Sequence, residues 1–181
     1  MADPFRTDED LLWSDNLLQS FRQSAFRLET RDTYALGYEQ ADFEQFLAGT
    51  PVPPPELGWW RPWLDEIARL TAEGKTVSRV RILAEPPSDY QRWEMWAARW
   101  HSQAGERIGY MTRAHAEQAG LPLPHDWWLL DDERVITMRF TDSGDIGRRE
   151  LITEPGTVAR FREWRDLAVQ NATPAEEIAA A

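Results

Sequence analysis

Cysteine is absent from this chain of 181 residues, and lysine occurs once, as Lys75. The absence of cysteine excludes disulfide bonds, thiolate metal sites and thiol nucleophiles. No segment approaches the 18 consecutive apolar residues of an ordinary transmembrane helix. The first residues, MADPFRTDEDLL, are acidic where a secretory signal would be basic and then apolar. We therefore expect a cytoplasmic protein that does not enter a membrane.

Positive charge is scarce: the formal net charge is −11 at pH 7, and most of the excess of acids over bases lies in the first third of the chain, where residues 1–56 carry eleven acids and four bases. A protein held to DNA or RNA by phosphate contacts needs a cationic face, so we expect no direct nucleic-acid binding. An acidic first third suits a basic protein partner or promotes solubility. The strong preference for arginine over lysine is typical of a GC-rich genome and points to an actinobacterial source.

Common catalytic signatures are also missing. The chain contains no glycine-rich phosphate loop, no GxSxG nucleophile elbow and no HExxH zinc motif. His101, His115 and His125 fall on three separate predicted elements, and we expect them at the surface or at helix ends. We therefore expect no metal and no cofactor, and the missing signatures favour a protein that is not an enzyme.

One acidic group follows an apolar run near the middle of the chain. Asp131 is followed by two more acids, and together with Asp89 and Glu94 it could form a magnesium site at the end of a strand. The favoured interpretation is that the acids after Asp131 cover a tight turn between two strands.

The chain does contain ten tryptophans, which suit a well-filled core. Its length fits one domain, and a domain of this size buries about 70% of the surface of its unfolded chain. We expect a single α/β domain over residues 1–173, beginning with a helix. Residues 174–181 are expected to form a frayed tail.

Hydrophobic periodicity gives the expected elements of the first half. A helix is predicted to begin at Ser14 or Asp15, with an apolar face formed by Leu17, Phe21, Ala25 and Leu28. A strand is predicted over 33–38 and a short helix over 42–47. The proline-rich segment TPVPPP at 50–55 cannot continue a helix or a sheet, so it predicts a stiff connector.

The second half alternates strands and helices more clearly. A helix runs from Pro62 to Gly74, a strand follows over 76–83, and Ser88 begins a helix that ends at Gly105. Strands are predicted over 107–112 and 127–131, with a short helix over 113–119 between them. A hairpin over 135–141 and 146–152 precedes a last helix capped by Thr153. The result is a mixed sheet of about five or six strands with helices packed on it.

Aromatic residues form two groups. Trp93, Trp96 and Trp100 fall at i, i+3 and i+7, which predicts one helix face buried against the sheet; stacking on a planar ligand is the alternative. A less regular group lies beside the proline-rich connector, and its partial exposure would suit a protein contact. This group consists of Trp59, Trp60 and Trp63.

Arg79 and Arg81 share one face of a predicted strand, because side chains alternate along a strand. Two adjacent guanidinium groups need carboxylate partners or an anion. An internal salt-bridge network is the favoured interpretation, and an anionic ligand or a partner contact are the alternatives. The candidate ligand or partner residues are Arg79, Arg81, Asp89, Tyr90, Glu94, Asp131, Glu29 and Tyr34.

Several segments together resemble a small uncharacterised actinobacterial family that is abundant in Streptomyces. They are SAFRLETRDTY at 24–34, RVRIL at 79–83, PPSDYQRWE at 86–94, AGERIGYM at 104–111, DWWLLDDERVITMRF at 126–140 and FREWRDLA at 161–168. Genes of that family often lie beside helix-turn-helix regulators and very short acidic proteins. The order of strands and helices also resembles half of the phospholipase-D-like fold, but the HxK signature of that fold is absent.

This resemblance implies a non-enzymatic regulatory or protein-interaction role, in which the chain partners a helix-turn-helix transcriptional regulator. The alternative is a small-ligand sensor or a biosynthetic enzyme with its site at the arginine and acid cluster.

Overall fold

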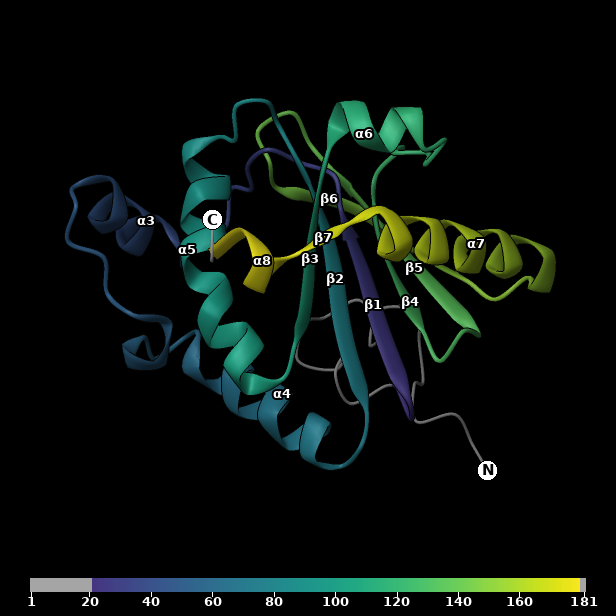
Figure 1. Cartoon of the computed structure of the whole chain (residues 1–181), viewed down its shortest axis with the longest axis horizontal. Helices are drawn as coiled ribbons and strands as arrows, with labels where there is room; N and C mark the ends of the chain where they lie inside the picture. Colours follow the sequence, from purple (N-terminus) through teal and green to yellow (C-terminus); the bar gives the residue numbers. More distant parts are fainter. Residues whose placement is uncertain (1–20, 180–181) are drawn as a thin grey trace.

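The structure, a computed structural model, describes residues 21–179. Within them, seven strands form one open mixed sheet in the order β6-β5-β4-β1-β2-β3-β7 (Figure 1). The strands are β1 (Ser24–Glu29), β2 (Thr76–Leu83), β3 (Arg107–Thr112), β4 (Asp126–Leu130), β5 (Arg134–Phe140), β6 (Ile146–Ile152) and β7 (Thr173–Pro174). Strands β1, β2 and β3 are parallel, and all other neighbours are antiparallel.

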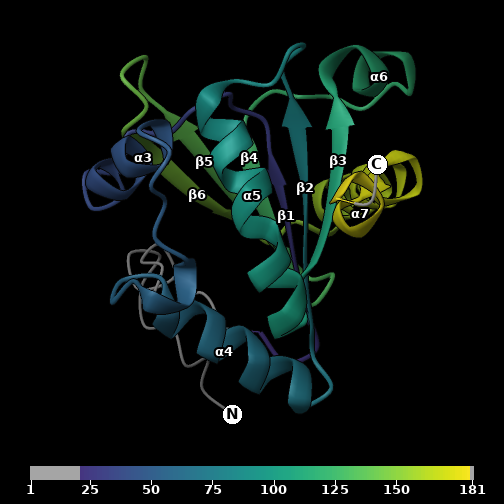
Figure 2. The ribbon, with the colours of Figure 1, turned by 60° about the vertical axis from the view of Figure 1, so that its left-hand side comes forward.

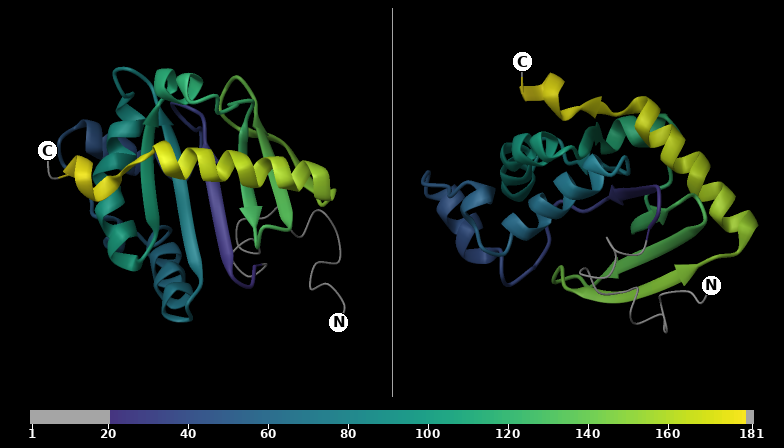
Figure 3. Two further views of the ribbon diagram at one scale, coloured as in Figure 1. Left: turned by 45° about the vertical axis from the view of Figure 1, so that its right-hand side comes forward. Right: turned by 90° about the horizontal axis from the view of Figure 1, so that it is seen from below.

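Six α-helices and one 3-10 turn accompany this sheet in the described part of the chain. They are α3 (Gln40–Leu47), η1 (Pro54–Glu56), α4 (Arg61–Ala72), α5 (Asp89–Ala104), α6 (Arg113–Gln118), α7 (Pro155–Asn171) and α8 (Ala175–Ala179). Helices α4 and α5 lie on one face of the sheet, and α7 crosses the opposite face (Figures 2 and 3). No helix within residues 21–179 has the length and apolarity needed to cross a bilayer.

The central strands are covered on both faces, and alternate residues point to opposite layers. In β2, Val80 and Ile82 join the cluster under α7, whereas Val77 belongs to the cluster under α4. In β1, Phe26 faces the α7 layer and Ala25 the α4 layer. The charged residues of these two strands therefore face the layer formed by α4 and α5.

The α/β class is confirmed, but the strand count is corrected from five or six to seven. The strand predicted over 33–38 is wrong, because that segment forms a loop. Two strands were not predicted. One is β1, and the other is the two-residue β7, which pairs with the outer edge of β3.

The helix predicted from Ser14 is wrong where it can be compared. Ala25 and Leu28 lie in strand β1, and Phe21 precedes this strand. The predicted start of the helix and Leu17 lie outside the described residues. The helical spacing was misleading because a strand buried on both faces carries an apolar run without strict alternation.

Several predicted ends of elements are confirmed. Ser88 and Gln91 form the capping box of α5, and Gly105 ends this helix in the left-handed conformation, with a φ of 102°. The cap predicted for the last helix is wrong: Glu154, not Thr153, accepts hydrogen bonds from the backbone N–H groups at the start of α7. Beyond α7, Pro174 lies in β7 and α8 follows it; the fraying expected for residues 174–181 stays a prediction.

The tryptophan stripe on α5 is only partly buried. Trp93 is 2% exposed and packs in an aromatic cluster with Trp60 and Tyr90, rather than on the sheet itself. Trp96 and Trp100 are half-buried and contact each other, with ring centroids 4.8 Å apart. The prediction that all three rings are buried against the sheet is therefore wrong for the last two.

Candidate functional site

A cavity of about 620 Å³ lies between the sheet and helices α4 and α5. Its floor is formed by charged side chains of β1 and β2, and its walls are mainly aromatic. Trp60 and Trp63 come from the start of α4, and Tyr90 and Trp93 come from α5. We call it the central cavity.

The floor of the central cavity follows from the register of the sheet. Strands β1 and β2 are parallel, and Arg27 is opposite Arg79 while Glu29 is opposite Arg81. All four side chains face α4 and α5, because they occupy alternate positions along their strands and so point to the same face of the sheet. Three arginines and one glutamate therefore meet on a patch of sheet that is largely closed to solvent.

Ion pairs tie these side chains together. Glu29 accepts from Arg81 Nε at 2.6 Å and from Arg79 Nη1 at 3.2 Å, and Arg27 Nε lies 3.2 Å from Glu29 Oε1. Arg81 also pairs with Glu94 of α5, at 3.1 Å. The predicted salt-bridge network is confirmed. Its contacts lower the pKa of Glu29, against the opposing effect of burial.

A second carboxylate supports this floor from the end of α5. Glu106 is 2% exposed and accepts from Arg79 Nε at 2.5 Å. Its other oxygen lies 2.6 Å from Nδ1 of His101. Burial alone would raise the pKa of Glu106, but Arg79 and His101 lower it to about 2. Burial lowers the pKa of His101, while Trp60 Nε1 donates to its Nε2 at 2.9 Å.

The loop between β1 and α3 is fastened to the sheet by Asp126, which is fully buried at the start of β4. Tyr34 donates its hydroxyl to Asp126 at 2.5 Å, and Thr30 donates both its backbone N–H and its hydroxyl, each at 2.8 Å. Arg27 Nη2 lies 3.6 Å from Oδ2 of Asp126, the oxygen that accepts from Tyr34. These bonds hold Tyr34 at the wall of the cavity.

The mouth of the central cavity is formed by less buried residues. Tyr38 is 59% exposed, and its ring lies 5.1 Å from that of Trp59, which stacks on Trp60 at 4.7 Å. Glu39 is half-buried and accepts a 2.5 Å hydrogen bond from the hydroxyl of Tyr90. A carboxyl group thus lies beside exposed aromatic rings where the cavity opens.

Two carboxyl groups of this cavity bind protons more tightly than usual. Burial raises the pKa of Glu39 to about 7, although the hydrogen bond from Tyr90 acts in the opposite direction. Burial also raises the pKa of Glu94, and the nearby Glu29 adds to this effect while Arg81 opposes it. Such carboxyl groups can exchange a proton near neutral pH, which suits a titrating binding site or acid–base chemistry.

Six of the eight candidate residues line the central cavity: Glu29, Tyr34, Arg79, Arg81, Tyr90 and Glu94. Asp89 lies elsewhere, exposed in the first turn of α5, where it binds Arg92. Asp131 is also outside the cavity. It lies in the turn after β4 with a φ of 54°, and its carboxylate accepts the backbone N–H groups of residues 22–24.

Five residues of the site were not among the predicted candidates, namely Arg27, Glu39, His101, Glu106 and Asp126. His101 was expected at the surface or a helix end; it is at a helix end but only 3% exposed. One available signal was the alternate spacing of Arg27 and Glu29, and of Arg79 and Arg81, which places each pair on one face of its strand. That signal could be used only with β1 assigned as a strand.

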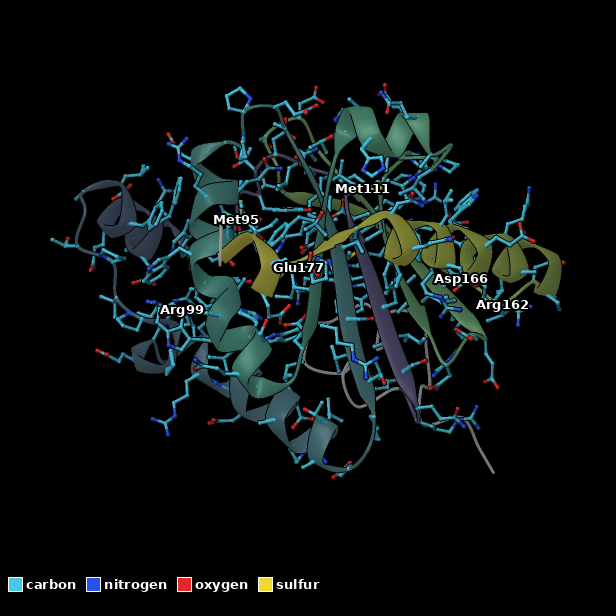
Figure 4. All side chains as sticks on the ribbon, in the orientation of Figure 1. Met95, Arg99, Met111, Arg162, Asp166 and Glu177 are labelled. Atoms are coloured by element: carbon cyan, nitrogen blue, oxygen red, sulfur yellow. The ribbon has the colours of Figure 1, made fainter. Side chains whose placement is uncertain are left out.

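A second hollow, of about 770 Å³, lies between α5, β3 and α8. Met95 and Arg99 project from α5 next to α8, which carries Glu177 (Figure 4). Its lining is mainly apolar, and ionisable groups do not converge on it as they do on the central cavity. In the described part of the chain, no three histidine, aspartate or glutamate side chains are placed to hold a metal ion.

Comparison with protein families adds one result to this geometry. Residues 13–180 match the domain of unknown function DUF6879. The chain belongs to the DUF6879 family. The match includes every residue of the central cavity, so the cavity is formed within a single DUF6879 domain. A search of curated proteins finds no match to the chain.

Proposed function

We propose that this DUF6879 protein binds a small organic ligand in the central cavity and acts as a ligand sensor. The convergence of polar groups within an aromatic cavity of about 620 Å³ carries this proposal, because small-molecule sites occupy roughly 300–1,000 Å³ and combine apolar walls with a few polar groups. Aromatic walls would supply most of the contact area, and the few polar groups near the floor and mouth would orient the ligand.

The salt-bridge network supports a binding role because it makes the cavity floor rigid. Arg79 and Arg81 are 5% and 6% exposed and are held by glutamates on several elements. A preformed floor lowers the entropy that binding must overcome. A ligand is therefore expected to bind without rearranging the sheet.

A thermal-shift screen tests the proposal. The panel contains small amines, carboxylates, phosphates and neutral aromatic compounds. A ligand at 100 times its Kd stabilises the fold by about 2.7 kcal/mol. For a domain of this size, that corresponds to a rise in Tm of roughly 5–10 °C.

Two matched variants locate the binding. Trp59→Ala removes a ring from the mouth of the cavity, whereas Trp164→Ala removes a half-buried ring packed on Phe161 in the α7 layer. A hit from the panel should lose its effect in Trp59→Ala and keep it in Trp164→Ala. The absence of any hit, or equal shifts in both variants, would contradict the proposal.

We also propose that a protein partner, either a helix-turn-helix regulator or another basic protein, binds this chain with an affinity that depends on whether the cavity holds a ligand. Two observations support this idea. The chain has a net charge of −11, and α3 next to the cavity mouth has no buried residue, with Leu47 53% exposed. Co-purification from the native host, with and without a hit from the panel, tests it. Recovery of the chain alone under both conditions would count against a partner.

A further inference from the structure

The mouth of the central cavity combines a carboxyl group with aromatic faces. Glu39 has no ion-pair partner within 4 Å among residues 21–179, and its one side-chain hydrogen bond there comes from the neutral hydroxyl of Tyr90. Tyr38 and Trp59, with rings 5.1 Å apart, lie at the same opening. Carboxylates and aromatic faces are the two groups that attract organic cations.

Each arginine of the floor, by contrast, already contacts a carboxylate, although Arg81 Nη1 and Arg27 Nε are buried donors that find no hydrogen-bond acceptor within residues 21–179. Arg27, Arg79 and Arg81 each contact Glu29, and two of them also stack on rings: Arg27 on Trp128 at 5.4 Å and Arg79 on Trp63 at 5.6 Å. An anionic ligand that paired with all three guanidinium groups would have to displace Glu29, which is 4% exposed. Breaking a buried pair in this way is costly, so the floor disfavours an anion.

The balance of charge in the network points in the same direction. Three arginines face Glu29, Glu94, Glu106 and Asp126, and Glu39 adds a further carboxyl group at the mouth. The cluster therefore holds more acids than bases. Because the pKa values of Glu39, Glu94 and Asp126 are raised, part of this excess is held as protonated carboxyl groups. An added cation would favour their ionised forms, and an added anion would favour their protonated forms.

We propose that the ligand of the central cavity carries a positively charged amine or quaternary ammonium group, which the Glu39 carboxylate and the rings of Tyr38 and Trp59 hold at the mouth. This inference rests on the proposed ligand-binding function. It adds the chemical class of the ligand and the residues that recognise its charge.

Binding of such a cation is linked to the loss of a proton. The groups that face Glu39 are Tyr38 on its own segment, Tyr90 and Glu94 on α5, and Glu29, Arg27 and Arg81 on the sheet. With the pKa of Glu39 raised to about 7, most copies are protonated at pH 6 and ionised at pH 8. A cation prefers the ionised form, so binding should be about tenfold weaker at pH 6 than at pH 8.

Calorimetric titration with three probes of similar size tests the inference. Benzyltrimethylammonium is a permanent cation, benzyl alcohol is neutral, and phenylacetate is an anion. We expect the cation to bind best at pH 8, to weaken about tenfold at pH 6, and to displace a proton into the buffer at pH 6.

Variants assign the effect to the mouth. Glu39→Gln keeps an acceptor for Tyr90 but removes the charge, and it should weaken cation binding at pH 8 at least tenfold and reduce its pH dependence to the part contributed by Glu94. Glu44→Gln on α3 is the matched control and should bind as the wild type does, because Glu44 does not line the cavity. At Trp59, substitution by Phe should retain binding and substitution by Leu should lose it.

The outcomes separate this inference from the function on which it rests. Binding of phenylacetate or benzyl alcohol as tight as that of the cation would overturn the charge assignment and leave a ligand-binding cavity. Unchanged cation affinity in Glu39→Gln would overturn the role of Glu39. A wild-type protein that binds none of the three probes and no compound of the thermal-shift panel would contradict both proposals.

Discussion

Arg79→Ala tests the interpretation of the cavity floor as a buried ionic network. The variant removes the 2.5 Å bond from Arg79 Nε to Glu106 and the 3.2 Å bond from Nη1 to Glu29. Glu29 keeps Arg27 and Arg81, but Glu106 keeps only His101. Removing one member of a buried pair costs about 3–5 kcal/mol, because the other charge is left without its partner.

Urea unfolding followed by tryptophan fluorescence and circular dichroism measures this loss. Arg61→Ala is the matched control, because Arg61 forms an exposed pair with Asp65 across one turn of α4. An exposed pair contributes about 1 kcal/mol or less. The double variant Arg79→Ala/Glu106→Gln removes the stranded charge, so it should be more stable than Arg79→Ala alone.

The pH dependence of the same variant gives an independent check. In the wild type the pKa of Glu106 falls from 4.5 to about 2, so this carboxylate stabilises the fold above pH 4.5 and loses that effect as the pH drops toward 2. Arg79→Ala removes most of this contribution. The difference in unfolding free energy between wild type and variant should therefore shrink below pH 4.5. A loss no larger than that of Arg61→Ala at pH 7, or a pH-independent difference, would refute the network.

Two further substitutions, one of them with a control, test the contacts around the cavity. Gly105→Ala places a methyl group 2.6 Å from Thr71 at a φ of 102°, and it should lower the free energy of unfolding in urea by about 2–4 kcal/mol. The control Gly120→Ala, with a φ of 75° and open space around it, should lower it by about 1 kcal/mol. Equal losses in the two variants would contradict the contact with Thr71. Tyr34→Phe removes the donor to the buried carboxyl of Asp126 and should cost about 1.5–3 kcal/mol, so a variant as stable as the wild type would show that this bond does not hold the loop.

The fold was predictable wherever the local signals agreed. The alternation over 76–83 identifies β2, the capping box identifies the start of α5, and the turn at Gly144 identifies the hairpin of β5 and β6. Strand β1 was missed because Ala25 and Leu28 lie three residues apart and face opposite layers of the sheet. Only tertiary coverage on both faces explains that pattern.

The site was predictable in part, for the same reason. Arg79 and Arg81 could be placed on one face from strand alternation alone, and their partners Glu29 and Glu94 were among the candidates considered. Asp89 was a wrong choice as a partner, because it precedes the first inward-facing turn of α5 and points to solvent. Glu39 had no local signal, since its position depends on a loop whose path is determined by tertiary contacts.

The central claim, that a ligand binds in the central cavity, can be tested with tryptophans that line this cavity. They are Trp59, Trp60, Trp63 and Trp93. Trp127 and Trp164 belong to the layer under α7, on the opposite face of the sheet. Indole N–H resonances, assigned with single Trp→Phe variants, can be followed in ¹H–¹⁵N spectra during titration with benzyltrimethylammonium at pH 8. Shifts confined to the four cavity indoles are predicted, with Trp59 and Trp60 affected most. Saturable shifts of Trp127 or Trp164 with unchanged cavity indoles would contradict a ligand site in this cavity.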